Sequence, residues 1–413
     1  MIAGKILILT ASQLCRNPRV VKEAATLGAS GYDVTVMSVA TQRRFERMDL
    51  ELMRGLPFRR VTLDYAQPDR RTQLRSFFQR GSTWCARAAL RHLRFESPAT
   101  LGPAGPLLRM ARAFPADLTI AHTEIPLWAA SILIRDGRRV AVDLEDWYSE
   151  DLLDADRQSR PLRLLREAEA FALSHAAYAS VPSASMADAL VEAYRCPRPL
   201  VVRNTFPLPL RSRGAQPASS GPPAFVWFSQ TIGPGRGLEQ FFAAWARTKN
   251  PSRVFLIGDE RPGYVASLVA SVIPERRDQV HILPLVAPGE LPGKLAEFDL
   301  GIAVEPRTPR SKDVTISNKV FQYLAAGLAL VATDTAGQRE VMSAAPACGL
   351  LIRADDTAQF AARLDELLGN PDRLRACQQA ARAAAEREFC WEREAPRMLN
   401  AVARALATPV PAV

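Results

Sequence analysis

The sequence predicts an α/β protein built from two parallel β-sheets, each covered by helices. Strand-like apolar runs alternate with segments of helical periodicity along most of the 413 residues. This alternation starts twice, at the N-terminus and again near residue 224, and a segment rich in Pro, Gly and Ser (206–223) separates the two starts. We therefore expect two domains, in agreement with a length above the usual size of one domain.

Each expected domain begins with a strand, a helix and a second strand. In the first domain (1–205) these are strand 5–10, helix 18–27 and strand 33–38. In the second domain (224–388) the expected elements are strand 225–228, helix 238–247, strands 254–257, 281–283 and 300–304, helix 318–326, strand 328–332 and a helical tail from about residue 357. Residues 206–223 are expected to form the linker, because they cannot supply a core.

The composition excludes several classes of protein. Runs of about eighteen uncharged apolar residues are missing, and the short apolar stretch at the N-terminus has no plausible cleavage site, so we expect a cytoplasmic protein. The six cysteines lack CxxC spacing and the four histidines do not cluster with them. A disulfide framework and a metal site are therefore not expected, and the thiols are expected to be reduced and buried.

A basic, amphipathic insertion covers about residues 66–112. Between 70 and 112 arginines interleave with large apolar residues, and acidic residues are almost missing. Two interpretations stay open. The segment binds an anionic membrane surface, or its apolar side belongs to the core and its arginines face water. A nucleic-acid partner is not expected, because no recognised binding module accompanies the net charge of +10.

Two segments of the second domain are suited to bind phosphate. After the strand at 225–228, the loop SQTIGPGRGLE brings Arg236 together with three glycines, Gly233, Gly235 and Gly237. Such a loop lets backbone amides approach a diphosphate, although a glycine-rich turn by itself is often only a tight connection. Loops that follow the strands of a parallel sheet are where ligands collect.

The second segment is the start of the helix at 318. Ser317 is expected to cap this helix with its side chain, and Lys319 adds positive charge at the end where the helix dipole is already positive. A lysine there is unfavourable unless an anion is present, which favours an anion site over a purely structural helix. Asn318 and Gln322 share one face, while Val320, Phe321 and Leu324 can point into the core.

These segments resemble a known family. The stretch SNKVFQYLAAGLALVATDTAGQREVM is similar to the signature of retaining, family-four-like glycosyltransferases (glycosyl transferases group 1) of the GT-B fold. The likeness covers nearly the whole chain. Further family segments are similar to the glycine loop, FLIGD, NPRVVKEAATLGASGYDVTVMS, PADLTIAHTEIPLWAA and VDLEDWYSEDL. The likeness implies two Rossmann-like domains that face each other across a cleft, with a C-terminal helix (389–413) that returns to the first domain.

The resemblance also implies the reaction. A sugar would pass from a nucleotide-diphosphate donor to a hydroxyl acceptor held by the first domain, with no further cofactor and no metal. Arg236 and Lys319 would neutralise the leaving diphosphate, and His122 would contact the transferred sugar. Glu340 would be a donor contact, or alternatively a carboxylate that the dipole of its helix favours. Glu124, Glu145 and Asp146 would bind or deprotonate the acceptor.

Two positions depart from the family pattern. Its pair of glutamates separated by seven residues is missing, since Gln322 and, eight positions earlier, Val314 occupy those places. Gln322 can bind ribose hydroxyls but supplies no carboxylate, and Glu305 is a candidate to compensate. The second departure is Glu145 where the related stretch has a histidine, which leaves an acidic cluster with Asp143, Asp146 and Glu150.

The partners expected from the residues and the resemblance are a nucleotide sugar and a sugar or lipid-linked acceptor, as in bacterial polysaccharide or glycolipid assembly. The alternatives are a nucleotide-sugar epimerase of the same fold and a non-catalytic relative that only binds the nucleotide sugar.

Overall fold

The computed structural model describes residues 3–209, 221–272 and 274–409. Two compact units divide the chain, one formed by residues 1–202 and 395–413 and the other by residues 203–394. The first boundary lies just before the expected linker, most of which (210–220) falls outside the described residues. In the described part of the chain, every helix is too short or too polar to cross a lipid bilayer.

The first unit holds a parallel sheet of seven strands in the order β3-β2-β1-β4-β5-β6-β7. The strands are β1 (Lys5–Thr10), β2 (Asp33–Ala40), β3 (Arg59–Asp64), β4 (Leu118–His122), β5 (Val140–Asp143), β6 (Ala179–Val181) and β7 (Leu200–Val201). The expected first strand is confirmed, and its side chains from Ile6 to Leu9 are fully buried. Such complete burial is what helices on both faces of a parallel sheet produce.

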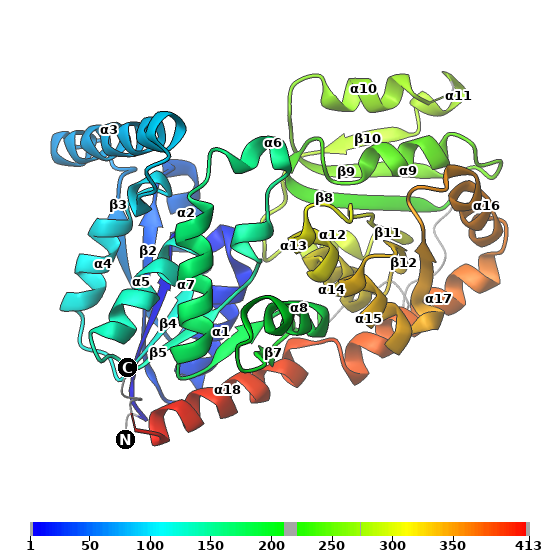
Figure 1. Ribbon diagram of the computed structural model, residues 1–413. Helices are drawn as coiled ribbons and strands as arrows, with labels where there is room; N and C mark the ends of the chain where they lie inside the picture. Colours follow the sequence, from blue (N-terminus) through cyan, green and yellow to red (C-terminus); the bar gives the residue numbers. More distant parts are fainter. Residues whose placement is uncertain (1–2, 210–220, 273, 410–413) are drawn as a thin grey trace. The chain divides into compact units, whose positions relative to one another are not determined.

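Eight α-helices connect these strands. They are α1 (Pro18–Ala29), α2 (Arg43–Leu52), α3 (Arg70–Leu93), α4 (Ala104–Ala113), α5 (Glu124–Arg135), α6 (Asp154–Arg157), α7 (Leu162–His175) and α8 (Ala184–Tyr194). Helices α4, α5 and α7 pack side by side in one layer (Figure 1). Short 3-10 turns complete the unit: η1 (Leu14–Arg16), η2 (Pro98–Thr100) and η3 (Tyr148–Glu150). The insertion thus consists mainly of α3, η2 and α4.

The second unit repeats this architecture with six parallel strands in the order β10-β9-β8-β11-β12-β13. The strands are β8 (Ala224–Ile232), β9 (Arg253–Glu260), β10 (Val280–Leu283), β11 (Leu300–Ala303), β12 (Ala329–Thr333) and β13 (Gly349–Ile352). The expected strands of this half are confirmed. Side chains of β8 alternate between two cores on opposite faces of the sheet, with Phe225 and Trp227 in one and Val226 in the other.

Ten α-helices and a 3-10 turn belong to the C-terminal half. They are α9 (Leu238–Trp245), α10 (Tyr264–Ala270), α11 (Pro274–Arg277), α12 (Leu291–Leu295), α13 (Arg310–Val314), α14 (Asn318–Ala326), α15 (Ala336–Ala344), η5 (Pro346–Cys348), α16 (Thr357–Leu368), α17 (Pro371–Arg387) and α18 (Trp391–Ala407). Most of α18 groups with the first unit, since that unit takes residues 395–413.

The cysteines differ in part from the expectation. All six are free thiols, and four of them are buried as expected. Cys85 is instead exposed on α3 and Cys15 is partly exposed. Helix α3 is therefore not covered in the way that its apolar sequence would predict for a core helix.

Candidate functional site

In both sheets the chain reverses its direction of winding at one point, between β1 and β4 in the first unit and between β8 and β11 in the second. Loops that leave neighbouring strands at such a point diverge to opposite faces of the sheet, which leaves room for a ligand at the carboxyl ends of the strands. Of the residues predicted from the sequence, His122 is the last residue of β4 and Arg236 lies in the loop after β8. Each unit therefore has a candidate site at its reversal point.

In the second unit, the glycine loop lies directly against the end of β11. Gly237 begins α9 with φ +76°, and a Cβ atom on this residue would lie 2.3 Å from the carbonyl oxygen of Val304. Only glycine accepts both the left-handed backbone and this contact. Gly235 also has a positive φ (+75°), but open space surrounds it, and Gly233 has no such requirement. The sequence-predicted loop thus contains one glycine that the packing demands.

The start of α14 corrects one expectation. Ser317 is the N-cap residue of the helix, but its side chain makes no capping hydrogen bond. Its hydroxyl instead donates to Oε1 of Glu305, at 3.0 Å. The carboxylate comes from the loop after β11. A hydrogen bond from the hydroxyl to this charged acceptor is stronger than the capping bond that the hydroxyl could accept from a backbone N–H of the helix. The expected helix bounds and the burial of Val320, Phe321 and Leu324 are confirmed.

Lys319 and Glu305 form a buried ion pair, in which Nζ donates to Oε1 at 2.8 Å. The ammonium also lies 5.3 Å from the centre of the Trp227 ring. The loop that carries Glu305 is fixed to the end of β12, because the Glu305 amide and carbonyl both bond to the hydroxyl of Thr333. The sequence indicates both charged residues as candidates, but their pairing across 14 residues is not visible in it.

Neighbouring charges shift the pKa values of both partners of this ion pair. Burial raises the pKa of Glu305, but Lys319 and Lys312 outweigh burial and lower it below its ordinary value. Burial also lowers the pKa of Lys319; Glu305 opposes this shift, whereas the charges of Arg236 and Lys312 add to it. Arg236 and Lys312 therefore add positive charge to the surroundings of Lys319, and positive charge at this place attracts an anion.

A cavity of about 670 Å³ adjoins this cluster within the second unit. Its lining consists of the residues that follow β11, β12 and β13, together with one residue of α9. These are Gln240, Glu305, Pro306, Arg307, Thr308, Thr333, Asp334, Arg353, Ala354 and Asp355. The cavity lies at the carboxyl edge of the sheet, where ligands of such folds bind.

Gln322 lies one turn along α14 from Asn318; the Gln322 side chain is partly buried, whereas Asn318 is exposed. The side-chain oxygen of Gln322 is buried without a hydrogen-bond partner. Such an orphan acceptor is costly in a folded protein and points to a missing donor. Glu340 lies in the second turn of α15, whose first turn holds no acidic residue, so the expected interaction of Glu340 with the helix N-terminus is wrong.

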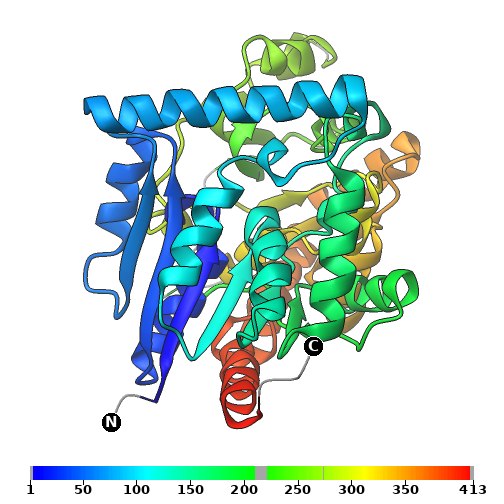
Figure 2. The same cartoon turned by 60° about the vertical axis from the view of Figure 1, so that its left-hand side comes forward.

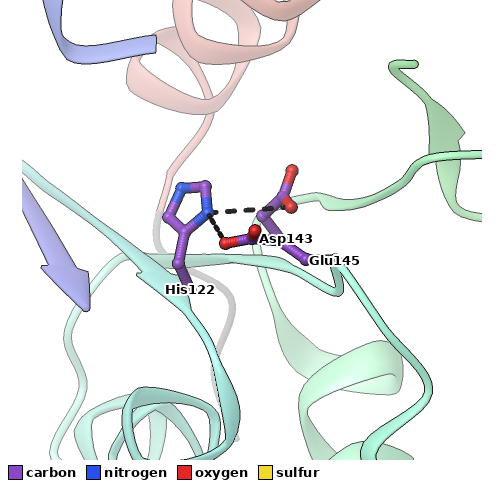
Figure 3. Close-up of side chains that lie close together, drawn as sticks. All are labelled: His122, Asp143 and Glu145. Carbon is purple, nitrogen blue, oxygen red and sulfur yellow. Dashed lines mark hydrogen bonds and ion pairs between the residues drawn. The ribbon is translucent and has the colours of Figure 1, made fainter. Parts of the chain in front are cut away.

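In the first unit, His122 ends β4 and is fully buried. Its Nε2 lies 2.6 Å from Glu23, and its Nδ1 lies 3.2 Å from Glu145 and 3.7 Å from Asp143 (Figure 3). Burial lowers the pKa of His122, but these carboxylates, Glu23 first, more than reverse the effect and raise it to about 10. The ring is thus a buried imidazolium that joins three carboxylates.

Arg19 completes this network. Its guanidinium forms a two-pronged pair with Asp143, at 2.7 and 2.6 Å, and also donates to the carbonyl of Val202. His122, Asp143 and Glu145 are close enough to share a metal ion, yet Arg19 already takes both oxygens of Asp143. The geometry therefore favours a charged hydrogen-bond network over a metal centre.

The sequence contained a signal for the residues of α1 that were not predicted. Arg19 and Glu23 are four residues apart, so they share one face of a helix that is otherwise buried there. Two opposite charges on such a face require charged partners elsewhere in the fold. The partners themselves, at the ends of β4 and β5, could not be identified from local spacing.

The acceptor-side candidates lie after β4 and β5. Glu124 is the first residue of α5 and pairs with Arg160, while burial raises the pKa of Glu124 despite that charge. Glu145 accepts a second hydrogen bond from Asn17 at 2.6 Å and keeps partial exposure. Asp146 follows it in the same loop. The structure thus brings His122 and Glu145 together, but shows no direct contact between either of them and Glu124.

Comparisons with known proteins agree with this architecture. Residues 222–370 match the family model described as glycosyl transferases group 1. The chain is also similar to the solved structure of sucrose-phosphate synthase from Thermosynechococcus elongatus, with 13% identity, 98% and 99% of the two chains covered and a TM-score of 0.72. A search of curated protein sequences finds no match.

Two further structures show the same likeness. Anabaena HepE in complex with UDP-glucose has 17% identity, coverage of 97% and 99% and a TM-score of 0.68. WaaG, a glycosyltransferase involved in lipopolysaccharide biosynthesis, has 13% identity, coverage of 95% and 98% and a TM-score of 0.61. At such low identity these structures establish the GT-B fold class of two Rossmann-like units. The resemblance to group 1 glycosyltransferases is confirmed over residues 222–370.

Proposed function

From the group 1 glycosyltransferase region at residues 222–370, we propose that the protein transfers a sugar from a nucleotide-diphosphate sugar to a hydroxyl acceptor. The observation that carries the proposal is the buried ammonium of Lys319 in the first turn of α14, at a helix start where Arg236 and Lys312 add positive charge. A diphosphate is an anion that such a helix start can bind. HepE was solved with UDP-glucose, so UDP sugars are the first donors to test.

The cations also account for the chemistry of the leaving group. When the bond between the sugar and the diphosphate breaks, negative charge develops on the phosphate oxygen that departs. Arg236 and Lys319 stabilise this charge, and the amides of the glycine loop around Gly235 assist them. We propose that these permanent cations fill the role that a divalent metal has in other transferases, so that the reaction is metal-independent.

The remaining donor contacts follow from α14 and α15. The unpaired oxygen of Gln322 can accept a hydrogen bond from a ribose hydroxyl, which would satisfy a buried acceptor that the free protein leaves orphaned. Ser317 and Asn318 lie at the same end of the helix. Glu340 is proposed to contact the ribose or the sugar, as its counterparts in similar enzymes suggest.

The acceptor is proposed to bind at the network of the first unit. Glu145, which is partly exposed, and Asp146 would orient the acceptor hydroxyl, and Glu124 would contribute from the start of α5. His122 is fully buried, so it is proposed to act as a charged anchor that holds Glu145 in place. Retention of configuration, in which the leaving phosphate accepts the proton of the acceptor hydroxyl, is proposed from the resemblance to retaining enzymes.

The basic segment 70–112 supports an acceptor that is lipid-linked or lies at the inner membrane surface, as in polysaccharide or glycolipid assembly. The two alternatives are an epimerase, which interconverts sugars without transfer, and a binding protein without turnover.

One assay separates these three functions. The protein is incubated with labelled nucleotide sugars, with and without lipid-linked acceptors, and the products are resolved by chromatography and mass spectrometry. Transfer is expected only with both substrates, with the anomeric configuration of the donor retained. A change of the donor sugar without acceptor would establish the epimerase, and saturable donor binding with neither product would establish the binding protein.

A further inference from the structure

Helix α3 presents its small and polar residues to the protein and its large apolar residues to solvent. Six side chains form its sheltered stripe, at spacings of four and three residues: Thr72, Ser76, Gln79, Thr83, Ala86 and Leu90. This is the period of one helix face. Within its unit, the helix contacts chiefly η2 (Pro98–Thr100), and its only fully buried residues are Thr72 and Leu90.

The opposite face is apolar and exposed. Its outer crest consists of Leu74, Phe77, Phe78 and Trp84, and the C-terminal end adds Leu93 and Phe95. These side chains are 55–76% exposed, and they make up six of the ten large apolar side chains that are exposed in the described part of the chain. Figures 1 and 2 show α3 on the outside of the first unit. For α3, the alternative interpretation of the sequence, in which this apolar side belongs to the core, is therefore wrong.

Positive charge flanks the crest on both sides. The 24 residues of α3 include six arginines and no acidic residue. Arg71 and Arg75 lie on one side of the crest, and Arg80, Arg87 and Arg91 lie on the other when the residues are placed at 100° intervals. Among the residues described, Arg71, Arg80 and Arg91 have no carboxylate partner within salt-bridge distance.

A hollow lies where the first turns of α3 meet the segment after β3. It has a volume of about 660 Å³, and its lining includes Arg70, Gln73 and Arg80 as well as the crest residues Leu74 and Phe77. Guanidinium groups bind phosphate through paired N–H donors. The hollow thus places phosphate-binding groups next to side chains that can enter a hydrocarbon layer.

We propose that α3 is an interfacial helix that binds the surface of an anionic lipid bilayer, with its aromatic crest inserted among the acyl chains and its arginines on lipid phosphates. The helix is about 36 Å long and lies parallel to such a surface. Charge complementarity selects this occupant, since a flat anionic surface satisfies both flanking rows of arginines and the apolar crest between them. The proposal is independent of transferase activity.

The test measures binding to vesicles in the absence of donor. We expect the protein to float with vesicles of phosphatidylcholine and phosphatidylglycerol, but not with vesicles of phosphatidylcholine alone, and added salt should release it. Trp84 is 72% exposed whereas the other tryptophans are at least partly buried, so binding should shift the tryptophan emission to shorter wavelength. The variant Trp84→Phe should keep the binding and lose most of this shift.

Paired variants identify the surface. Two combined variants should each weaken binding at least tenfold. One carries Phe77→Ser with Phe78→Ser, and the other carries Arg71→Gln with Arg80→Gln and Arg91→Gln. In the second variant, each arginine near a membrane contributes about fivefold. Leu50→Ser with Ile282→Ser removes exposed apolar side chains elsewhere and should bind as the parent does. Thermal unfolding should show that all variants are folded.

Several results would overturn the proposal. They are equal flotation with neutral vesicles, retention of binding in both α3 variants, and loss of binding in the control variant. Self-association in lipid-free solution that the Phe77 and Phe78 changes abolish would show a second copy as the partner of the crest. Tighter binding to a single-stranded RNA than to anionic vesicles would show a nucleic-acid surface instead.

Discussion

Glu305 and Lys319 face each other across the end of the second sheet, with the ammonium 2.8 Å from one carboxylate oxygen and both side chains buried. The carboxylate comes from the loop after β11 and the lysine from the first turn of α14. Glu305 thus holds the lysine at the helix start, and Arg236 and Lys312 add positive charge to its surroundings. The lysine that we propose binds the diphosphate is therefore fixed in position by the protein itself.

Arg236→Ala should lower kcat/KM by roughly 10- to 150-fold with little loss of stability, because it removes a charge-assisted contact of about 1.5–3 kcal/mol. Lys319→Ala should lose transfer and also destabilise the protein by several kcal/mol, because it leaves Glu305 buried without its partner. Lys319→Met with Glu305→Gln should restore much of the stability but not the activity. Steady-state kinetics and urea unfolding measure both effects, and full activity of Arg236→Ala would remove that residue from the donor site.

Gly237→Ala should disrupt the glycine loop, since its Cβ would lie 2.3 Å from the Val304 carbonyl. We expect a loss of more than about 1 kcal/mol in unfolding free energy and a marked loss of nucleotide affinity. Gly235→Ala is the matched control, because it has the same sign of φ but no atoms near the added methyl group. Equal effects of the two changes on nucleotide affinity, measured by calorimetry, would show that contact with β11 is unimportant.

Gln322→Leu should leave stability unchanged or slightly higher, because it removes a buried acceptor that has no partner. The affinity for nucleoside diphosphate should fall by roughly 2- to 13-fold, the worth of one neutral hydrogen bond. Affinities for the diphosphates of a ribonucleoside and of its 2′,3′-dideoxy analogue make the test specific. If the parent does not distinguish the two ligands, Gln322 does not bind the ribose.

Arg19→Ala should cost about 3–5 kcal/mol of unfolding free energy, because Asp143 would stay buried without the guanidinium that holds both of its oxygens. Arg59→Ala removes an exposed arginine from its pair with Asp33 and should cost less than about 1 kcal/mol. Urea unfolding of the two variants supplies the comparison. A small loss in both would mean that Asp143 finds other partners.

His122 should make the stability of the protein depend on pH in the alkaline range. Its pKa is raised from 6.5 to about 10 in the folded state, so its contribution is complete below pH 6.5 and is lost as the pH rises toward 10. The parent should lose on the order of a few kcal/mol over this range relative to His122→Gln, which has no such group. Urea unfolding of both proteins at pH 7 and 9.5 gives the difference, which should be absent if the ring is neutral.

Local patterns predicted most of the fold. The apolar runs of β1 and β8 and the helical period of α14 depend on neighbours in sequence, and those elements are confirmed. The contacts made over long separations were not predictable in this way. The hydroxyl of Ser317 bonds to Glu305, twelve residues away, and not to the backbone at the helix end. Arg19 bonds to Asp143, which is 124 residues away in the sequence.

The amphipathic pattern of α3 illustrates a different limit. Its sequence shows that one face is apolar but does not show which face turns toward the protein, because either can be sheltered. In the structure the stripe through Ser76, Thr83 and Ala86 is the sheltered side, whereas Phe77 and Phe78 are exposed. An alternation of small and large residues is the sequence signal that could have indicated it.

The outward position of Phe77 and Phe78 has a consequence for how the protein can change over generations. Because these side chains add almost nothing to the folding of the unit, substitutions there are nearly free of a stability cost. The crest can therefore change in sequence while the sheet stays as it is. If the proposed membrane binding holds, such changes would adapt the protein to the lipid composition of a different membrane, and an engineer could use them to redirect the helix to another surface.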